Sequence, residues 1–191
     1  MVDSQEISET QLICLHEASH AVLAFLLGFQ ITSIEINRDE KNGICCRDFR
    51  SSRQSIIPEL RDVPELEKHV MVCCAGYASM NIIKNSNQCW DYSADYANAV
   101  RVLEPKYDKR IIGTYIESVL SWAIEILQEN WSAVEMLTDR LMWYAEKNRF
   151  EDYPGNDFED LLPPDYFEEP ESWEMSGEEA EQIIERALVG Y

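Results

Sequence analysis

The residues best suited to chemistry are two histidines four positions apart with a glutamate between them, in the sequence His16-Glu17-Ala18-Ser19-His20. Positions four apart on an α-helix differ by about 40° around its axis, so both imidazoles project from one face and can hold one divalent cation. Glu17 points to the flank where a water ligand of the cation would lie, as a general base requires. Two histidines and an intervening glutamate on a helix are typical of zinc metallopeptidases. The spacing predicts a zinc site with Glu17 as its general base.

A catalytic zinc site usually takes a third ligand from the protein. The downstream candidates are His69, Cys89, Asp91 and Asp95. His69 lies beside charged residues, where a surface histidine is the simpler interpretation, and a thiolate at Cys89 would fit poorly with a peptidase water. Asp91 also suits a helix N-cap and Asp95 a first-turn acid. Spacing by itself leaves the choice between these two carboxylates open.

The element that must position the motif is a helix. Ser8 and Gln11 form an S-x-x-Q capping box, apolar residues then recur at helical spacing, and Gly28 suits a C-terminal stop. A β-hairpin is predicted next, because residues 31–36 alternate apolar and polar side chains. Asn42-Gly43 predicts its turn, followed by a short strand near residues 44–47.

The remainder of the chain is predicted to be mostly helical. Apolar periodicity predicts helices over residues 64–83, 93–103 and 111–146, the last with a break near Asn130, and a final helix from a capping box at Ser176. Residues 150–175 are acidic and carry prolines, which predicts a loop inserted before that helix. We therefore predict one metallopeptidase-like domain over residues 1–191, mainly α with a small β-hairpin or sheet.

Composition limits the classes of function. The formal net charge is −20, and residues 151–191 contribute 14 acidic residues against one arginine. Such a field repels phosphate backbones, so we expect no nucleic-acid partner. The chain has no apolar run long enough to cross a bilayer and no signal-peptide pattern at its start. Its six cysteines lack CxxC spacing, which favours free thiols in a reducing compartment. We expect a cytoplasmic protein with no membrane span.

Several segments resemble the peptidase domain of the FtsH family of ATP-dependent zinc proteases. LHEASHAVLAFLLG is similar to that family's HEAGHALVA-type helix, and VMVCCAGYASMNII resembles its second helix with the pattern A-G-R-x-A-E-E-L. SADYANAVRVL resembles the G-A-x-N-D-x-x-x-A-T segment, whose aspartate is the family's third zinc ligand. WAIEILQENWSAVEMLTDRL and MSGEEAEQII resemble its closing helices in order and character. The resemblance spans residues 12–187.

This resemblance implies a fold, a ligand set and an activity. The family's aspartate falls on Asp95, so His16, His20 and Asp95 would hold zinc, with Glu17 as the general base. The implied activity is hydrolysis of peptide bonds in peptides or unfolded proteins. The hairpin would supply an edge strand along which an extended substrate could lie. The partners it implies include further copies of the chain or a separate ATPase.

The chain also departs from the family. It contains no G-x-x-x-x-G-K-[ST] phosphate loop, so we expect activity without ATP from this chain alone. Met80 and Asn81 stand where family members carry acidic residues. These departures motivate an alternative, a proteolytically inactive FtsH-like protein that keeps the fold or the zinc site and acts by binding or regulation.

Overall fold

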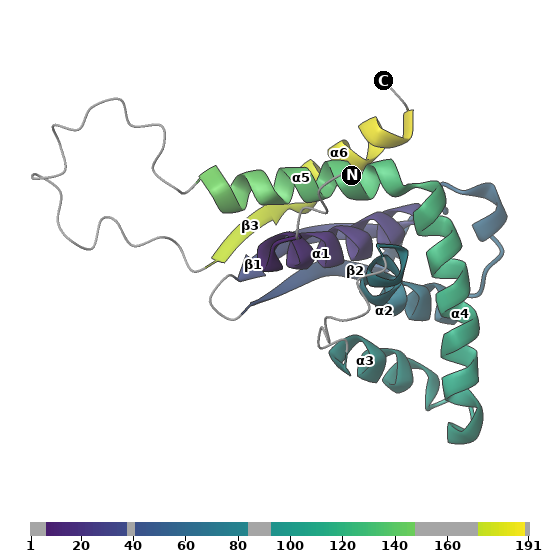
Figure 1. The fold of residues 1–191 in the computed structure, drawn as a ribbon. Helices are drawn as coiled ribbons and strands as arrows, with labels where there is room; N and C mark the ends of the chain where they lie inside the picture. Colours follow the sequence, from purple (N-terminus) through teal and green to yellow (C-terminus); the bar gives the residue numbers. More distant parts are fainter. Residues whose placement is uncertain (1–6, 38–40, 84–92, 148–171, 190–191) are drawn as a thin grey trace, which may run out of the picture.

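The computed structural model describes residues 7–37, 41–83, 93–147 and 172–189. Within them, helices dominate and three strands form one small antiparallel sheet (Figure 1). This confirms the predicted fold class, mainly α with a small sheet. The elements in chain order are α1 (Glu9–Leu26), β1 (Phe29–Asn37), β2 (Asn42–Ser52), the 3₁₀ turn η1 (Pro58–Leu60), α2 (Glu65–Ile82), α3 (Ser93–Leu103), α4 (Lys109–Glu129), α5 (Trp131–Lys147), β3 (Ser172–Ser176) and α6 (Gly177–Val189).

Helix α1 lies at the centre of the molecule. Ser8 caps its start by accepting a hydrogen bond from the Gln11 amide at 3.2 Å, as predicted. Just past its end, Gly28 has φ +90°, and a Cβ there would lie 2.2 Å from the Arg53 carbonyl oxygen. The helix packs against α2, α5, β1 and β2, which is why nearly every residue after its first turn is buried. The motif-bearing helix is therefore held on several sides.

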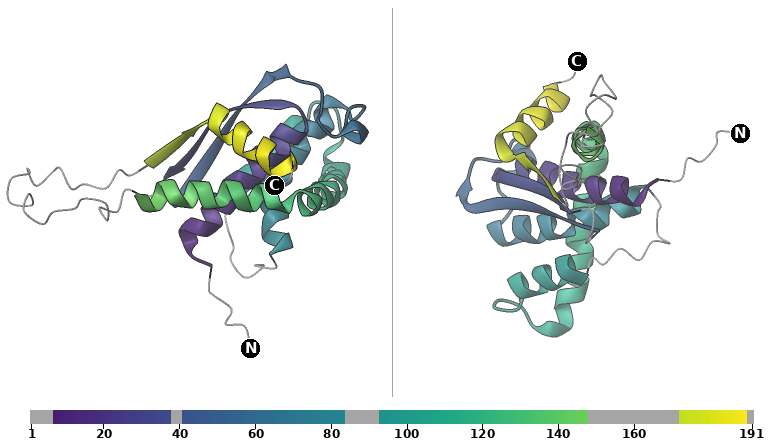
Figure 2. Two further views of the ribbon diagram at one scale, coloured as in Figure 1. Left: turned by 90° about the horizontal axis from the view of Figure 1, so that it is seen from above. Right: turned by 90° about the vertical axis from the view of Figure 1, so that its left-hand side faces the viewer.

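The sheet has the strand order β2-β1-β3, so β2 forms one edge (Figure 2). The predicted turn at Asn42-Gly43 is wrong. These residues belong to β2 and pair with Asn37 and Ile36, so the chain reverses before them. Lys41, at the end of the connection, has φ +53°, the left-handed conformation that tight reversals need. β2 is also longer than the predicted 44–47 because its pairing with β1 continues to Ser52.

Strand β3 was not predicted. Residues 172–176 fall at the end of the segment 150–175 that composition assigned to a loop, and the rest of that segment lies outside the described residues. Trp173 and Met175 are buried against the core, while Ser172, Glu174 and Ser176, which alternate with them, are exposed. The strand forms because it pairs with β1. Its alternation of exposed and buried side chains covers only five residues, too few to stand out in the sequence beside the acidic, proline-bearing residues before it.

The remaining predicted helices are confirmed. Helix α4 extends from the level of α3 to that of α5 in Figure 1, and it ends at Asn130, where a break was predicted. The Asn130 side chain donates a hydrogen bond to the Ile126 carbonyl at 2.8 Å, closing the last turn. The last helix, α6, begins after Ser176, whose hydroxyl accepts from the Glu179 amide at 3.2 Å.

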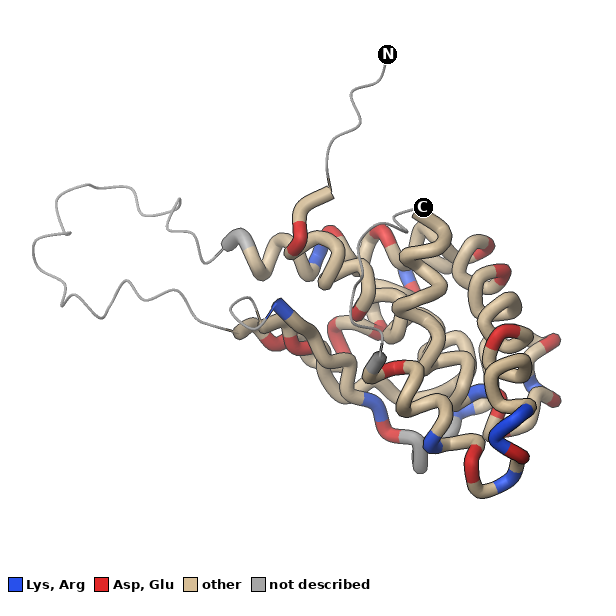
Figure 3. Tube along the Cα trace, turned by 60° about the horizontal axis from the view of Figure 1, so that its bottom comes forward, with Lys and Arg blue, Asp and Glu red and all other residues tan. Residues whose placement is uncertain are grey.

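The charged residues of the described chain are spread over its elements rather than clustered in one place. Figure 3 shows acidic residues spread over several helices and strands of the described chain, with fewer basic residues among them. In the described part of the chain, no helix combines the length and apolar character needed to cross a membrane. None of the five described cysteines forms a disulfide, and all except Cys46 are buried.

Candidate metal centre

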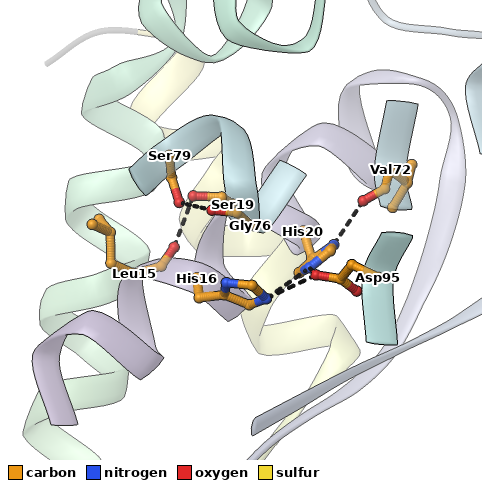
Figure 4. Close-up of polar contacts among 8 residues, drawn as sticks. All are labelled: Leu15, His16, Ser19, His20, Val72, Gly76, Ser79 and Asp95. Carbon is orange, nitrogen blue, oxygen red and sulfur yellow. Dashed lines mark hydrogen bonds and ion pairs between the residues drawn. The ribbon is translucent and has the colours of Figure 1, made fainter. Parts of the chain in front are cut away.

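Three side chains from two helices converge on one point (Figure 4). His16 and His20 project from α1, and Asp95 comes from the first turn of α3. His16 Nε2 and His20 Nε2 each lie 3.0 Å from Asp95 Oδ2, and 3.1 Å separates the two nitrogens. Among the described residues, this is the one group of three or more potential ligand side chains that could hold a metal ion. The structure thus brings together the two motif histidines and one of the two carboxylates left open by spacing.

The tautomer of His20 suits metal binding. Its Nδ1 lies 2.7 Å from the Val72 carbonyl oxygen, which can only accept, so Nδ1 carries a proton. In a neutral His20 the Nε2 atom then has a free lone pair, and that lone pair faces the Asp95 carboxylate. Two acceptors at this separation repel each other unless a proton or a metal cation lies between them. In metal sites, the nitrogen of a ligand histidine that does not face the metal usually donates to a carbonyl or carboxylate in this way.

The spacing of the three atoms fits a small divalent cation. For zinc–ligand bonds of 2.0–2.1 Å in tetrahedral geometry, neighbouring ligand atoms lie about 3.3 Å apart. The observed separations of 3.0–3.1 Å differ from that value by only a few tenths of an ångström. Two imidazoles and one carboxylate are a ligand set that zinc accepts, and they leave a fourth position for water or substrate. The residues present therefore fit the metal that the sequence predicts.

The electrostatics of the group reflect its close packing. Burial would by itself raise the pKa of Asp95, but the charges and hydrogen bonds of His20 and His16 hold it well below its usual value. Burial would lower the pKa of His16, yet the hydrogen bond to Asp95 and the charges of Glu17 and Asp95 raise it. In the absence of a cation, Asp95 and His16 therefore each stabilise the charged form of the other.

Helix α2 closes the site from behind because its residues there are small. A Cβ on Gly76 would lie only 2.1 Å from His16 Cε1, so the imidazole rests directly against the α2 backbone. Ser19 and Ser79 are buried nearby, and each hydroxyl donates to a carbonyl of its own helix, Leu15 at 2.7 Å and Gly76 at 2.8 Å. Small side chains with internally satisfied hydroxyls let the two helices approach closely.

Gly76→Ala is expected to weaken zinc binding by at least about tenfold, because the new methyl group must displace the His16 ring. Gly113→Ala is the matched control. It also places alanine inside a helix, but its Cβ meets only the Tyr96 hydroxyl at 3.8 Å. It should keep zinc and gain about 0.5–1 kcal/mol of stability. Zinc titration against a competing chelator measures the zinc affinity, and thermal unfolding measures the stability of Gly113→Ala. Equal zinc affinity in the two variants would contradict the assignment of His16 as a zinc ligand.

Glu17 lies beside the group and is only 5% exposed. Its side chain packs against Gly43 of β2, where a Cβ would lie 2.5 Å from Glu17 Cγ. Its negative charge raises the pKa of His16 on one side and contributes to the raised pKa of Cys45 on the other. Gly43 therefore leaves room for a carboxylate at the flank of the metal group, which is the place a general base needs.

The group opens into a cavity of about 450 Å³. One wall comes from α1 and another from the start of α3. The wall opposite is formed by Lys41 and by the edge strand β2 that follows it, which contributes Asn42, Gly43, Ile44, Cys45 and Arg47. An exposed strand edge beside a metal group is a surface on which an extended peptide could form backbone hydrogen bonds.

The other sequence candidates for the third ligand do not join the group. His69 lies elsewhere on α2, where its Nε2 is 3.5 Å from Glu65 and its ring meets Phe29 edge-on. Burial lowers the pKa of His69. Cys89 and Asp91 lie outside the described residues. Burial also raises the pKa of Cys45 and of Cys74 to about 12, so these thiols remain protonated at neutral pH.

Sequence reasoning missed the residues that surround the ligands, namely Gly43, Arg47, Val72 and Gly76. A signal existed for Gly76, because a glycine inside a helical pattern costs about 1 kcal/mol and often marks a close approach. Gly43 was assigned to a turn, which hid its contact with Glu17. The Val72 carbonyl and the Arg47 side chain gave no local signal, since their positions depend on how α2 and β2 pack against α1.

Comparison of the chain with models of known protein families and with curated proteins finds no match. The function proposed below therefore stands on the geometry of the site and on the sequence resemblance.

Proposed function

We propose that this protein is a zinc metallopeptidase similar to the peptidase domain of the FtsH family, and that it hydrolyses peptides or unfolded segments without ATP in this chain. The observation that carries the proposal is the convergence of His16 Nε2, His20 Nε2 and Asp95 Oδ2 within 3.1 Å, with Glu17 beside them. These three atoms would hold the zinc ion. Bound there, zinc would polarise a peptide carbonyl and make a water molecule more acidic.

Each of the chain's own residues then has a defined task. The Glu17 carboxylate accepts a proton from the attacking water and passes it to the leaving amine, and Gly43 leaves the space it occupies. The Val72 carbonyl holds His20 in the tautomer that presents Nε2. Strand β2 can align an extended substrate along the cavity through backbone hydrogen bonds. Together these groups supply a general base, a fixed orientation of the ligand His20 and a strand edge that binds the substrate backbone.

The test begins with protein purified without chelators. We expect one zinc ion per chain by elemental analysis, cleavage of unstructured peptides from a broad library, loss of cleavage on chelation and its recovery on adding zinc. Zinc should also raise the stability to unfolding by about 4 kcal/mol at a free concentration 1,000 times its dissociation constant.

His69→Gln is the control for this experiment, since it removes a histidine outside the group and should leave the zinc content at one per chain. If the purified protein binds no stoichiometric metal, both the zinc site and the peptidase activity are contradicted. Zinc binding with no cleavage across the library would contradict the peptidase activity and favour the alternative, a binding or regulatory protein with the same site.

A further inference from the structure

Helix α3 contributes Ala94, Asp95 and Asn98 to the wall of the cavity. Residues three apart on a helix are neighbours on its surface, with Cβ atoms about 5–6 Å apart. Helical side chains also lean toward the N-terminus, so the Asn98 side chain covers the turn that carries Asp95. Ala94 has no polar group in its side chain, and Asp95 already contacts both histidines. Asn98 is therefore the polar side chain of this wall that remains to meet a substrate.

A hydrogen bond from Arg101 sets the orientation of the Asn98 amide. Arg101 Nη1 donates to Asn98 Oδ1 at 3.1 Å, and a guanidinium has no acceptor that could bind the other end of the amide. The oxygen of Asn98 therefore faces Arg101, one turn further along α3, and its Nδ2 group is turned away from Arg101. Because Asn98 is exposed, the two N–H bonds of Nδ2 are accessible to a bound substrate.

The other side-chain donors of the wall, apart from the histidines of the metal group, already have partners. Lys41 pairs with Glu9 at 3.0 Å, and Asn42 and Arg47 each interact with another group of the protein. Within the described part of the chain, by contrast, Asn98 is bonded through its oxygen, and its Nδ2 group has no acceptor. Asn98 is therefore the side chain of the wall best able to donate a new hydrogen bond.

Hydrolysis of a peptide bond requires such a donor. When the water oxygen bonds to the carbonyl carbon, an electron pair of the C=O double bond moves onto the carbonyl oxygen, which becomes negatively charged. That charge is absent from the bound substrate, so a donor about 2.7–3.1 Å from this oxygen stabilises the transition state more than the substrate. Glu17 cannot supply the hydrogen bond, because an ionised carboxylate only accepts.

We propose that Asn98 is a catalytic residue, whose Nδ2 group donates a hydrogen bond to the oxygen of the scissile carbonyl as negative charge develops there. The inference rests on the proposed function and goes beyond it by giving the α3 wall a part in the reaction. The two sides of the cavity then act differently. Edge strand β2 aligns the backbone of the peptide, and Asn98 on the other side stabilises the reacting carbonyl group.

Asn98→Ala is expected to lower kcat by at least about tenfold and to leave KM and zinc affinity within about twofold of the unaltered protein. The fold should persist, since Asn98 is exposed and alanine favours a helix. Asn98→Leu, which keeps most of the side-chain volume but has no N–H group, should behave in the same way. Asn81→Ala is the matched control at an exposed position of α2 outside the cavity, and it should leave all three quantities unchanged.

Inhibitor binding gives a readout that does not depend on turnover. A phosphinic peptide carries a tetrahedral, negatively charged group in place of the scissile bond, so it resembles the transition state. Asn98→Ala should weaken the binding of this inhibitor by about the same factor by which it lowers kcat/KM. In zinc-loaded Glu17→Gln protein, the same change should alter the binding of the uncleaved parent peptide by less than about twofold.

Unchanged kcat and unchanged inhibitor binding in Asn98→Ala would overturn the inference and leave the peptidase proposal intact. Equal losses of affinity for the phosphinic peptide and for the parent peptide would also overturn it, because Asn98 would then bind substrate and transition state equally. If the unaltered zinc-loaded protein neither cleaves any peptide nor binds the phosphinic peptide, the peptidase proposal fails together with the inference.

Discussion

Glu17→Gln is expected to lower the rate of peptide hydrolysis by about 10²–10⁴-fold while the protein keeps its zinc. The amide has nearly the same shape as the carboxylate but cannot accept the proton of the attacking water. Zinc should remain because Glu17 is not one of the three converging side chains. The measurement is kcat/KM on the best library peptide, with zinc content determined on the same sample.

Glu125→Gln is the control for this change, since it makes the same substitution at an exposed position of α4 and should leave both quantities unaltered. Full activity in Glu17→Gln would show that another group acts as the base, or that the cleavage came from a contaminating protease. Loss of zinc in Glu17→Gln would show instead that Glu17 takes part in holding the metal.

Asp95→Asn is expected to weaken zinc binding by at least about 100-fold. The substitution removes the negative charge that both histidines face at 3.0 Å and replaces it with a neutral, poorer ligand. Loss of a group that only hydrogen-bonds to a metal ligand already costs about 10- to 100-fold in metal affinity, so loss of a ligand should cost no less. Titration of the metal-free protein with zinc against a chelator of known affinity measures the change.

Asp91→Asn is the matched comparison, because Asp91 was the alternative carboxylate that spacing left open. It should keep zinc affinity within a fewfold of the unaltered protein. The reverse pattern, with zinc lost in Asp91→Asn and kept in Asp95→Asn, would reject Asp95 as the third ligand. In that case the contacts of Asp95 with the two histidines would belong to the metal-free protein alone.

Much of the fold could be predicted because its signals are local. Capping residues and apolar periodicity marked α1 and α6 at their starts, and a break was predicted near Asn130, the residue that caps the end of α4. The hairpin was predicted, but its turn was misplaced. Asn42-Gly43 is a good turn dipeptide, yet pairing with β1 holds it inside a strand. Long-range pairing overruled local turn preference there, and it also created β3.

The sequence by itself determined the chemical core of the candidate site. Spacing of four on a capped, strongly apolar helix is enough to place His16 and His20 on one face, whatever else packs around them. Their convergence with one carboxylate was not determined in this way. Asp95 lies 75 residues beyond His20, and only a family resemblance favoured it over Asp91.

The tertiary structure decided what surrounds that core. Packing of α3 and α2 brings Asp95 to both histidines, and glycines on α2 and β2 leave the space that His16 and Glu17 occupy. The placement of β2 makes Arg47 part of the cavity wall. The physical reason is the range of each interaction. Helical spacing acts over one turn of the chain. The meeting of Asp95 with the two histidines, and the close approach of α2 and β2 to α1, depend instead on contacts between segments far apart in sequence.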